Sequence, residues 1–103
     1  MQDQPLRVLF VCTANICRSP HLELTARALA GEGSGMEFAS AGTHGFLDHP
    51  MDEVMSQTLA PDAATSFRSR RLDRTALADA DLVLTAEETH RAFIVQEFPA
   101  AFR

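Results

Sequence analysis

The chain has 103 residues, with 9 Lys and Arg against 14 Asp and Glu, and a formal net charge of -5. This length predicts one domain over residues 1–103 around one core, and a content of 46% hydrophobic and 22% charged residues excludes a disordered or fibrous chain. The acidic balance argues against a nucleic-acid partner. The apolar run Val8 to Cys12 is too short to span a bilayer, and no signal peptide precedes it. We therefore expect a cytoplasmic protein without a membrane partner.

The first predicted elements are a strand, a tight loop and a helix. Residues Leu6 to Cys12 are nearly all apolar, as in a parallel strand that is covered on both faces. After the loop, Ser19 is predicted to be the helix N-cap and Pro20 the first helical residue. Gly31 is expected to end this helix.

A second strand is predicted at Met36 to Ala41, and a loop follows it. Pro50 then opens a predicted helix that ends at Pro61. The apolar side of this helix is expected to carry Met51, Val54, Met55 and Leu59.

The last third begins with a basic cluster, for which we expect a solvated face or a docking surface for acidic phosphopeptides. Thr75 to Asp79 predicts a short helix, and Leu82 to Leu84 a third strand. Thr85 and Glu88 have the spacing of a capping box for a final helix, which Pro99 would stop. The basic cluster is Arg68, Arg70, Arg71 and Arg74, and the expected core residues of the final helix are Phe93, Ile94 and Phe98.

Strands that alternate with helices predict an α/β fold, an open parallel sheet flanked by helices, with the functional loop between the first strand and the first helix. Three strands make a thin sheet, so we expect it to be truncated. Either a further segment or a partner would complete it, and a homodimer through the open sheet edge is one such arrangement.

The only two cysteines, Cys12 and Cys17, are too few for a disulfide scaffold or a structural zinc site, so no metal is expected. Thiol chemistry or two inert core thiols remain. In an open parallel sheet the ligand crevice lies at the carboxyl ends of the strands, where Cys12 ends the first one.

The loop after Cys12 has the composition of an oxyanion site. Its backbone N–H groups precede a helix N-terminus, Arg18 is spaced to fold back on the same anion, and this positive field favours a thiolate. Ser19 would donate a hydrogen bond to the sulfur. A phosphate or sulfate ion is the expected ligand, and no nucleotide P-loop pattern is present. The predicted phosphate-binding residues are Thr13, Ala14, Asn15, Ile16, Cys17 and Arg18.

Three segments together resemble the low-molecular-weight protein tyrosine phosphatase family. The loop Val11-Cys12 with Asn15-Ile16-Cys17-Arg18-Ser19-Pro20 and Glu23 matches its signature. Ser40-Ala41-Gly42-Thr43 is similar to a second segment, and Asp81-Leu82-Val83-Leu84 with His90 to a third. The resemblance spans nearly the whole chain, with the signature loop as its most specific part.

The resemblance implies a phosphatase that acts on a phosphorylated protein or a small aryl phosphate without a cofactor. Cys12 would form a phosphocysteine, while Arg18 would bind the phosphate and Ser19 would assist the thiolate. Asn15, with Ser40, would hold the loop backbone. Cys17 resembles the neighbouring cysteine that protects the nucleophile through a reversible disulfide, although an inert thiol is equally consistent with the sequence.

The chain also departs from the family pattern. Family members are longer and carry an Asp-Pro pair whose aspartate protonates the leaving oxygen, and this sequence has no Asp-Pro. We therefore expect impaired turnover of unactivated phosphotyrosine. Asp48 and Asp52 are the local carboxylates to test as substitutes, although helix stabilisation explains them as well. Phe67 stands where the family often has a loop-supporting histidine, and Phe46 is the candidate aromatic wall of the cleft.

Other interpretations remain open. A thiol-dependent arsenate reductase on the same scaffold is one, although no cysteine follows Cys17 to resolve the intermediate. A non-catalytic phosphate-binding module is another. Cys12 as a buried cysteine with Arg18 as a surface arginine is the third. The four histidines are expected to be surface or capping residues: His21, His44, His49 and His90.

Overall fold

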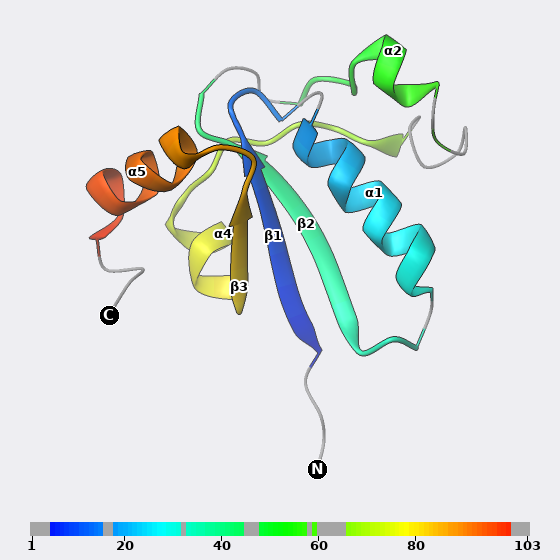
Figure 1. The fold of residues 1–103 in the computed structure, drawn as a ribbon, viewed down its shortest axis with the longest axis horizontal. Helices are drawn as coiled ribbons and strands as arrows, with labels where there is room; N and C mark the ends of the chain where they lie inside the picture. The colour runs from blue at the N-terminus through cyan, green and yellow to red at the C-terminus, as the bar shows by residue number, and fades with distance from the viewer. Residues whose placement is uncertain are drawn as a thin grey trace.

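The computed structural model describes residues 5–15, 18–31, 33–44, 48–57, 59 and 66–99. Its centre is a three-stranded parallel sheet in the order β2-β1-β3 (Figure 1). The strands are β1 (Leu6–Cys12), β2 (Met36–Gly42) and β3 (Leu82–Thr85). The predicted α/β fold with a parallel sheet of three strands is confirmed.

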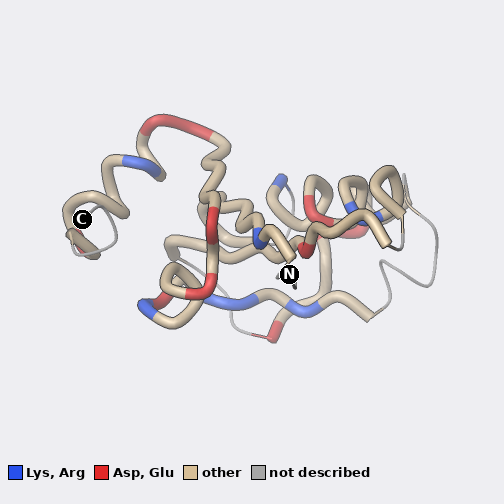
Figure 2. Tube along the Cα trace, turned by 90° about the horizontal axis from the view of Figure 1, so that it is seen from below, with Lys and Arg blue, Asp and Glu red and all other residues tan. Residues whose placement is uncertain are grey.

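Within the described residues, four helices accompany the sheet (Figure 1). Helix α1 contacts β1 and β2, whereas α4 contacts β1 and α5 contacts β3. The acidic turn before α5 is red in Figure 2 and stands away from the sheet. The helices are α1 (Arg18–Ala30), α2 (Glu53–Ser56), α4 (Arg74–Asp79) and α5 (Glu88–Glu97).

The central strand β1 is buried on both faces, as its apolar composition predicts. On one face, a cluster of buried apolar side chains packs around Leu9 and Val11. On the other, the rings of Phe10 and Phe38 stack with centroids 6.2 Å apart. Each fully buried side chain of this size contributes about 1.5–3 kcal/mol. The cluster around Leu9 and Val11 also contains Ala41, Leu72, Ala76, Leu77 and Ile94.

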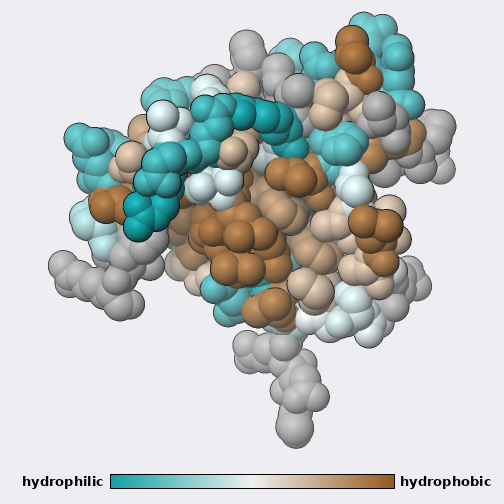
Figure 3. All heavy atoms as spheres, in the orientation of Figure 1, coloured by the Kyte–Doolittle hydropathy of each residue, from teal (hydrophilic) through white to brown (hydrophobic). Residues whose placement is uncertain are grey.

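Strand β3 lies at an edge of the described sheet and leaves apolar side chains exposed. Leu82 pairs with Val8 and Leu84 with Phe10, so these side chains share one sheet face. Both leucines are about half exposed. Figure 3 shows an apolar patch in the middle of the face that it presents. A homodimer through this edge stays a prediction.

The sequence misplaced the start of the first helix. Helix α1 begins at Arg18, so Ser19 lies inside it and is not its N-cap. The Ser19 hydroxyl is within hydrogen-bond distance of Cys12 Sγ and accepts from Asn15 Nδ2. The end was predicted correctly, because Gly31 follows α1 with a φ of 73°.

The second predicted helix is shorter than expected. It begins at Glu53 because the carboxylate of Asp52 caps it, accepting from Met55 N at 3.1 Å. Val54 is 70% exposed and therefore lies off the packed side, in contrast to Met51 and Met55. The predicted end at Pro61 falls outside the described residues.

The last helix uses a different capping box from the predicted one. Glu87 is the N-cap of α5 and His90 completes the box, whereas Thr85 is the last residue of β3. Among the expected core residues of α5, Ile94 is fully buried, and Phe93 and Phe98 are half-buried. The short helix at Thr75 to Asp79 is confirmed as α4, one residue longer at its start.

Candidate active site

The site begins where the ladder between β1 and β2 continues into the loop. Beyond the last paired residues, Thr43 N donates to Cys12 O at 2.9 Å and His44 N to Thr13 O at 2.8 Å. Gly42 makes this approach possible, since a Cβ there would lie 2.7 Å from Thr13 O and 2.9 Å from Ala14 C. The loop therefore packs directly on the backbone at the end of β2.

The thiol of Cys12 lies at the floor of this loop. Its Sγ is 2.9 Å from Ser19 Oγ and accepts a hydrogen bond of 3.3 Å from Asn15 N. Cys12 is 3% exposed, and Asn15 and Ser19 are 0% exposed. Asn15 N therefore donates to the sulfur, whereas either partner of the Cys12–Ser19 pair can be the donor. The structure thus brings together three of the predicted site residues.

Asn15 holds the loop in an unusual backbone conformation. Its φ is 61°, in the left-handed region that asparagine tolerates better than other non-glycine residues. Its Nδ2 donates to Ser19 Oγ at 2.8 Å, and its Oδ1 accepts from Arg70 N at 2.9 Å. Two side-chain hydrogen bonds therefore fix this turn, as expected for a residue that supports the loop.

Ser40 connects to Asn15 through Arg70 rather than by a direct hydrogen bond that the structure records. Its hydroxyl donates to Glu23 Oε1 at 2.5 Å, and its carbonyl accepts from Arg70 Nε at 3.1 Å. Arg70 is therefore the residue that links Ser40 to Asn15. Glu23 also pairs with Arg27 at 2.6 Å, and burial raises the pKa of the Glu23 carboxyl.

Charged groups lie at the rim of the site. Arg18 Nη1 forms an ion pair with Glu87 Oε1, which brings the start of α1 to the start of α5. The two side chains are 45% and 52% exposed. Arg18 lowers the pKa of Glu87 by hydrogen bonding and by its charge, so this carboxylate is ionised at neutral pH.

His90, in the first turn of α5, is buried beneath this rim and faces the loop. Its Nε2 is 2.9 Å from Thr13 Oγ1, and its Nδ1 accepts from Glu87 N at 3.0 Å. Burial lowers the pKa of His90, and the Arg18 guanidinium lowers it further. The expectation of a surface or capping histidine is therefore half right here, because His90 caps α5 but is 3% exposed.

Three of the residues assigned to the site or its cleft from the sequence, Ile16, Cys17 and Phe46, lie outside the described residues. Phe67, at the position where the family often has a histidine, packs with Leu24 and Met51. Within the part of the chain that the structure describes, no group of three His, Cys, Asp or Glu side chains is placed to hold a metal ion.

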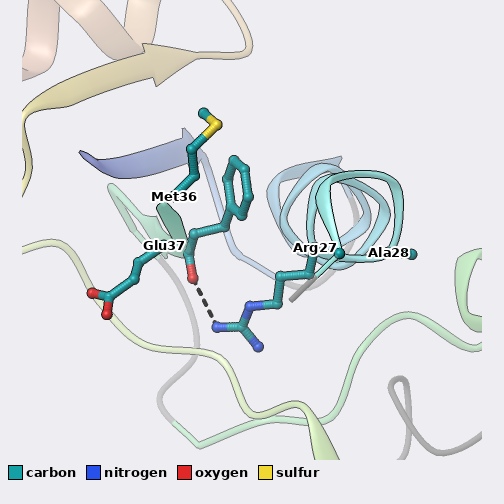
Figure 4. Close-up of a pocket in the computed structure, with 6 residues that line it drawn as sticks. Arg27, Ala28, Met36 and Glu37 are labelled. Atoms are coloured by element: carbon teal, nitrogen blue, oxygen red, sulfur yellow. Dashed lines mark hydrogen bonds between the residues drawn. The ribbon is translucent and has the colours of Figure 1, made fainter. Parts of the chain in front are cut away.

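A separate hollow of about 620 Å³ lies at the opposite end of the sheet. It is lined by Met36, the first residue of β2, and by the end of α1, where Arg27 donates to Phe38 O at 2.7 Å (Figure 4). Because the ligand crevice of a parallel sheet lies at the carboxyl ends of its strands, this hollow is not the site around Cys12.

Sequence reasoning missed the roles of Gly42, Arg70 and Glu87. Gly42 lies in a segment that the sequence connects to the site only through the family resemblance. Glycine is required there because the loop backbone packs against it, which no local pattern reports. Arg70 stood in a cluster interpreted as a solvated face, but its backbone N–H and Nε are both bonded. Glu87 directly precedes a helix, and an acidic residue there usually indicates only a cap.

The strand, the buried thiol and the following helix define a class of α/β proteins with a cysteine at the base of the loop between the first strand and the first helix. A sequence model described as low molecular weight phosphotyrosine protein phosphatase matches residues 7–102. The chain belongs to this family.

Relatives and solved structures agree with this assignment. The low molecular weight protein-tyrosine-phosphatase Etp of Escherichia coli K12 is 33% identical over 94 residues, covering 89% of this chain and 62% of its own length. The phosphatase structure from T. tengcongensis has a TM-score of 0.84 at 33% identity, covering 91% and 67% of the two chains. The YwlE arginine phosphatase of Geobacillus stearothermophilus has a TM-score of 0.84 at 30% identity, covering 95% and 63%.

The chain spans about three fifths of the length of the first curated relatives that it matches. None of the helices in the described residues is both long and apolar enough to cross a membrane.

Proposed function

We propose that this chain is a phosphatase that hydrolyses phosphotyrosine or aryl phosphate monoesters through a phosphocysteine. The observation that carries the proposal is the buried Cys12 sulfur at the carboxyl end of β1, which accepts a hydrogen bond from Asn15 N in the loop and lies 2.9 Å from Ser19 Oγ. Membership of the phosphotyrosine phosphatase family supports the substrate class. A thiol that must stay reduced also fits the predicted cytoplasmic location.

The reaction would proceed in two steps. In the first, the Cys12 thiolate attacks phosphorus, an S–P bond forms, and the P–O bond to the leaving alcohol breaks. Arg18 and the loop amides would bind the three non-bridging oxygens as charge develops on them. In the second, water attacks phosphorus, the S–P bond breaks, and inorganic phosphate and the thiolate are released.

Protonation of the leaving oxygen would be the weak part of this mechanism. The sequence contains no Asp-Pro pair, and Asp52 is occupied as the cap of α2. Glu87 is close to Arg18, but its pKa is lowered, so at neutral pH it carries no proton to donate. General acid catalysis contributes about 10²–10⁴ in rate, and good leaving groups need it least. We therefore expect a strong preference for activated aryl phosphates.

The decisive experiment compares para-nitrophenyl phosphate with phosphotyrosine in the wild type and in Cys12→Ser. The wild type should turn over the activated ester, and rapid quenching should trap one phosphoryl group on Cys12 by mass spectrometry. Cys12→Ser should lose all turnover and still bind phosphate. Turnover that survives in Cys12→Ser contradicts the proposal. Oxyanion binding without turnover favours the phosphate-binding module, and thiol-coupled arsenate reduction favours the reductase.

A second candidate substrate is protein phosphoarginine. The relative with a TM-score of 0.84 from Geobacillus stearothermophilus is named an arginine phosphatase, so the family includes this substrate class. A phosphoarginine peptide and a phosphotyrosine peptide of the same sequence, assayed side by side, separate the two. A higher kcat/KM for phosphoarginine would replace the aryl ester as the proposed substrate.

A further inference from the structure

The imidazole of His90 joins two parts of the site that are distant in sequence. One nitrogen contacts Thr13, in the loop after β1, and the other contacts the backbone of Glu87, at the start of α5. The ring is 3% exposed, so water does not readily replace either partner. One buried side chain therefore connects the anion loop to the residue that pairs with Arg18.

These two contacts select one form of the ring. The backbone N–H of Glu87 is a donor, so Nδ1 must be an unprotonated acceptor. The hydrogen of the neutral ring is then on Nε2, from which it is donated to Thr13 Oγ1. A protonated His90 would place a hydrogen on Nδ1 against the Glu87 amide hydrogen and break the capping box.

The charged groups around the ring come from three elements. Arg18 of α1 and His44 after β2 disfavour a positive charge on His90, and Glu87 on its own helix favours it. Burial is the largest cause of the lowered pKa of His90. The neutral ring therefore prevails at neutral pH, and acidification below its ordinary range is needed to protonate it.

We propose that uncharged His90 is a positioning residue for oxyanion binding, because it fixes the start of α5 and thereby holds Glu87 against Arg18. If Nδ1 no longer accepts from the Glu87 amide, the backbone at Glu87 is no longer held in place. The Glu87 carboxylate then no longer orients the Arg18 guanidinium. The inference rests on the proposed function in one respect, since it takes Arg18 as a ligand of the oxyanion. Thr13 is the second contact, and it keeps the ring in place.

The charge of a protonated His90 and the loss of its hydrogen bond predict opposite effects of acidification on oxyanion binding. A measurement of the sign therefore tests the inference. An imidazolium near the loop would attract an anion by Coulomb's law and strengthen binding on acidification. A broken cap would weaken binding instead, because Arg18 loses its orientation. The sign of the change decides between them.

The test measures sulfate binding to the Cys12→Ser chain by NMR of the loop amides, at about pH 7.5 and at an acidic pH where the imidazole nitrogen shifts report a protonated His90. In the Cys12→Ser background, binding is measured without turnover. We expect the dissociation constant of sulfate to rise about threefold to tenfold on acidification, the size of one lost hydrogen bond. The imidazole nitrogen shifts should show the hydrogen on Nε2 at neutral pH.

Two variants at the same position separate the two contacts of the ring. The side-chain oxygen of His90→Asn takes the place of Nδ1, so this variant should bind sulfate within about twofold of the parent at neutral pH, independently of pH. His90→Gln offers a donor near Nε2 but no acceptor at Nδ1, so it should bind about threefold to tenfold more weakly at both pH values. His44→Gln is the control and should keep the pH dependence.

Three results would overturn the inference: tighter sulfate binding on acidification, neutral-pH affinity that is unchanged in His90→Gln, or an acid loss that persists in His90→Asn. These leave the proposed phosphatase activity intact. If sulfate fails to bind the loop at either pH, Arg18 is not an oxyanion ligand, and the proposed function falls together with this inference. The pH titration of the parent chain needs no substitution at His90, so it decides even if a variant fails to fold.

Discussion

The floor of the site is almost completely buried, whereas its rim is half open to solvent. Cys12, Asn15 and Ser19 are at most 3% exposed, and each has hydrogen bonds to the others. Arg18 and Glu87 at the rim are 45% and 52% exposed and are joined by an ion pair. The two regions are adjacent in sequence at Arg18 and Ser19, yet they are held by different forces.

This difference predicts different consequences for stability and binding. A buried polar atom that loses its partner costs about 1–3 kcal/mol, so the floor resists rearrangement. An exposed ion pair contributes little to stability and is screened by salt, so the pair of Arg18 and Glu87 does little to hold the fold. Changes to the floor should therefore reduce both stability and anion binding, and changes to the rim mainly binding.

The largest expected effect is that of Gly42→Ala. Its Cβ would lie within 3 Å of the loop backbone at Thr13 and Ala14, which cannot rotate away as a side chain can. We expect a loss of about 1–3 kcal/mol in unfolding free energy and about a hundredfold loss in phosphate affinity. Urea denaturation and phosphate titration measure the two.

Gly35→Ala is the matched control for Gly42→Ala. Gly35 has a φ of 77° and open space around its Cβ position, so only backbone strain should appear. It should cost about 1 kcal/mol and leave phosphate affinity unchanged. Equal losses of affinity in the two variants would contradict the close approach of loop and strand.

The next largest effect is expected at Asn15, where two variants separate backbone strain from side-chain bonding. Asn15→Ala loses both side-chain hydrogen bonds and must keep a left-handed φ without them. Asn15→Gly loses the same bonds but adopts this φ freely. Asn15→Ala should therefore be less stable than Asn15→Gly by about 1 kcal/mol in urea denaturation. If the glycine variant is the less stable of the two, the left-handed backbone is not strained.

Much of the floor could be read from the sequence because its parts are close together in the chain. Cys12, Asn15 and Ser19 lie on one strand, loop and helix, whose apolar run and breaker residues are local signals. The parallel sheet followed from the alternation of strands and helices. Helix boundaries were less predictable from the sequence. Ser19 has the hydroxyl of a typical N-cap but lies inside α1 beside Cys12 Sγ, whereas Glu87 is the N-cap of α5.

The contacts that join distant segments were out of reach of such signals. Arg70 to Asn15 and His90 to Thr13 span 55 and 77 residues. No periodicity or spacing reports which arginine of a basic cluster turns its backbone toward the loop. The same holds for Gly42, whose need for space exists only once the loop is folded against it.

A smaller effect is expected at Glu23, and it depends on pH. Burial raises the pKa of Glu23 above 4.5, so its contribution to stability is full below the unfolded value and is lost as the pH rises through the folded one. Glu23→Gln stays neutral and lacks this loss. Its stability relative to the wild type should therefore improve between about pH 4 and about pH 7, by less than the losses predicted above. A constant difference in thermal melts across this range would show that the buried carboxyl does not titrate as inferred.

The smallest effect on stability should come from Glu87→Gln at the rim. Because the pKa of Glu87 is lowered from 4.5, its stabilising contribution is present above that value and is lost as the pH falls through the folded pKa. Solvent exposure makes this contribution small, and about 1 M salt should remove it. Glu88→Gln is the matched control, because Glu88 is the neighbouring exposed carboxylate and pairs with Arg91 on the same helix. Both variants should melt close to the wild type, but only Glu87→Gln should increase the mobility of the Arg18 side chain in NMR relaxation. If Glu87→Gln instead unfolds as readily as the floor variants, the rim is part of the rigid core of the site.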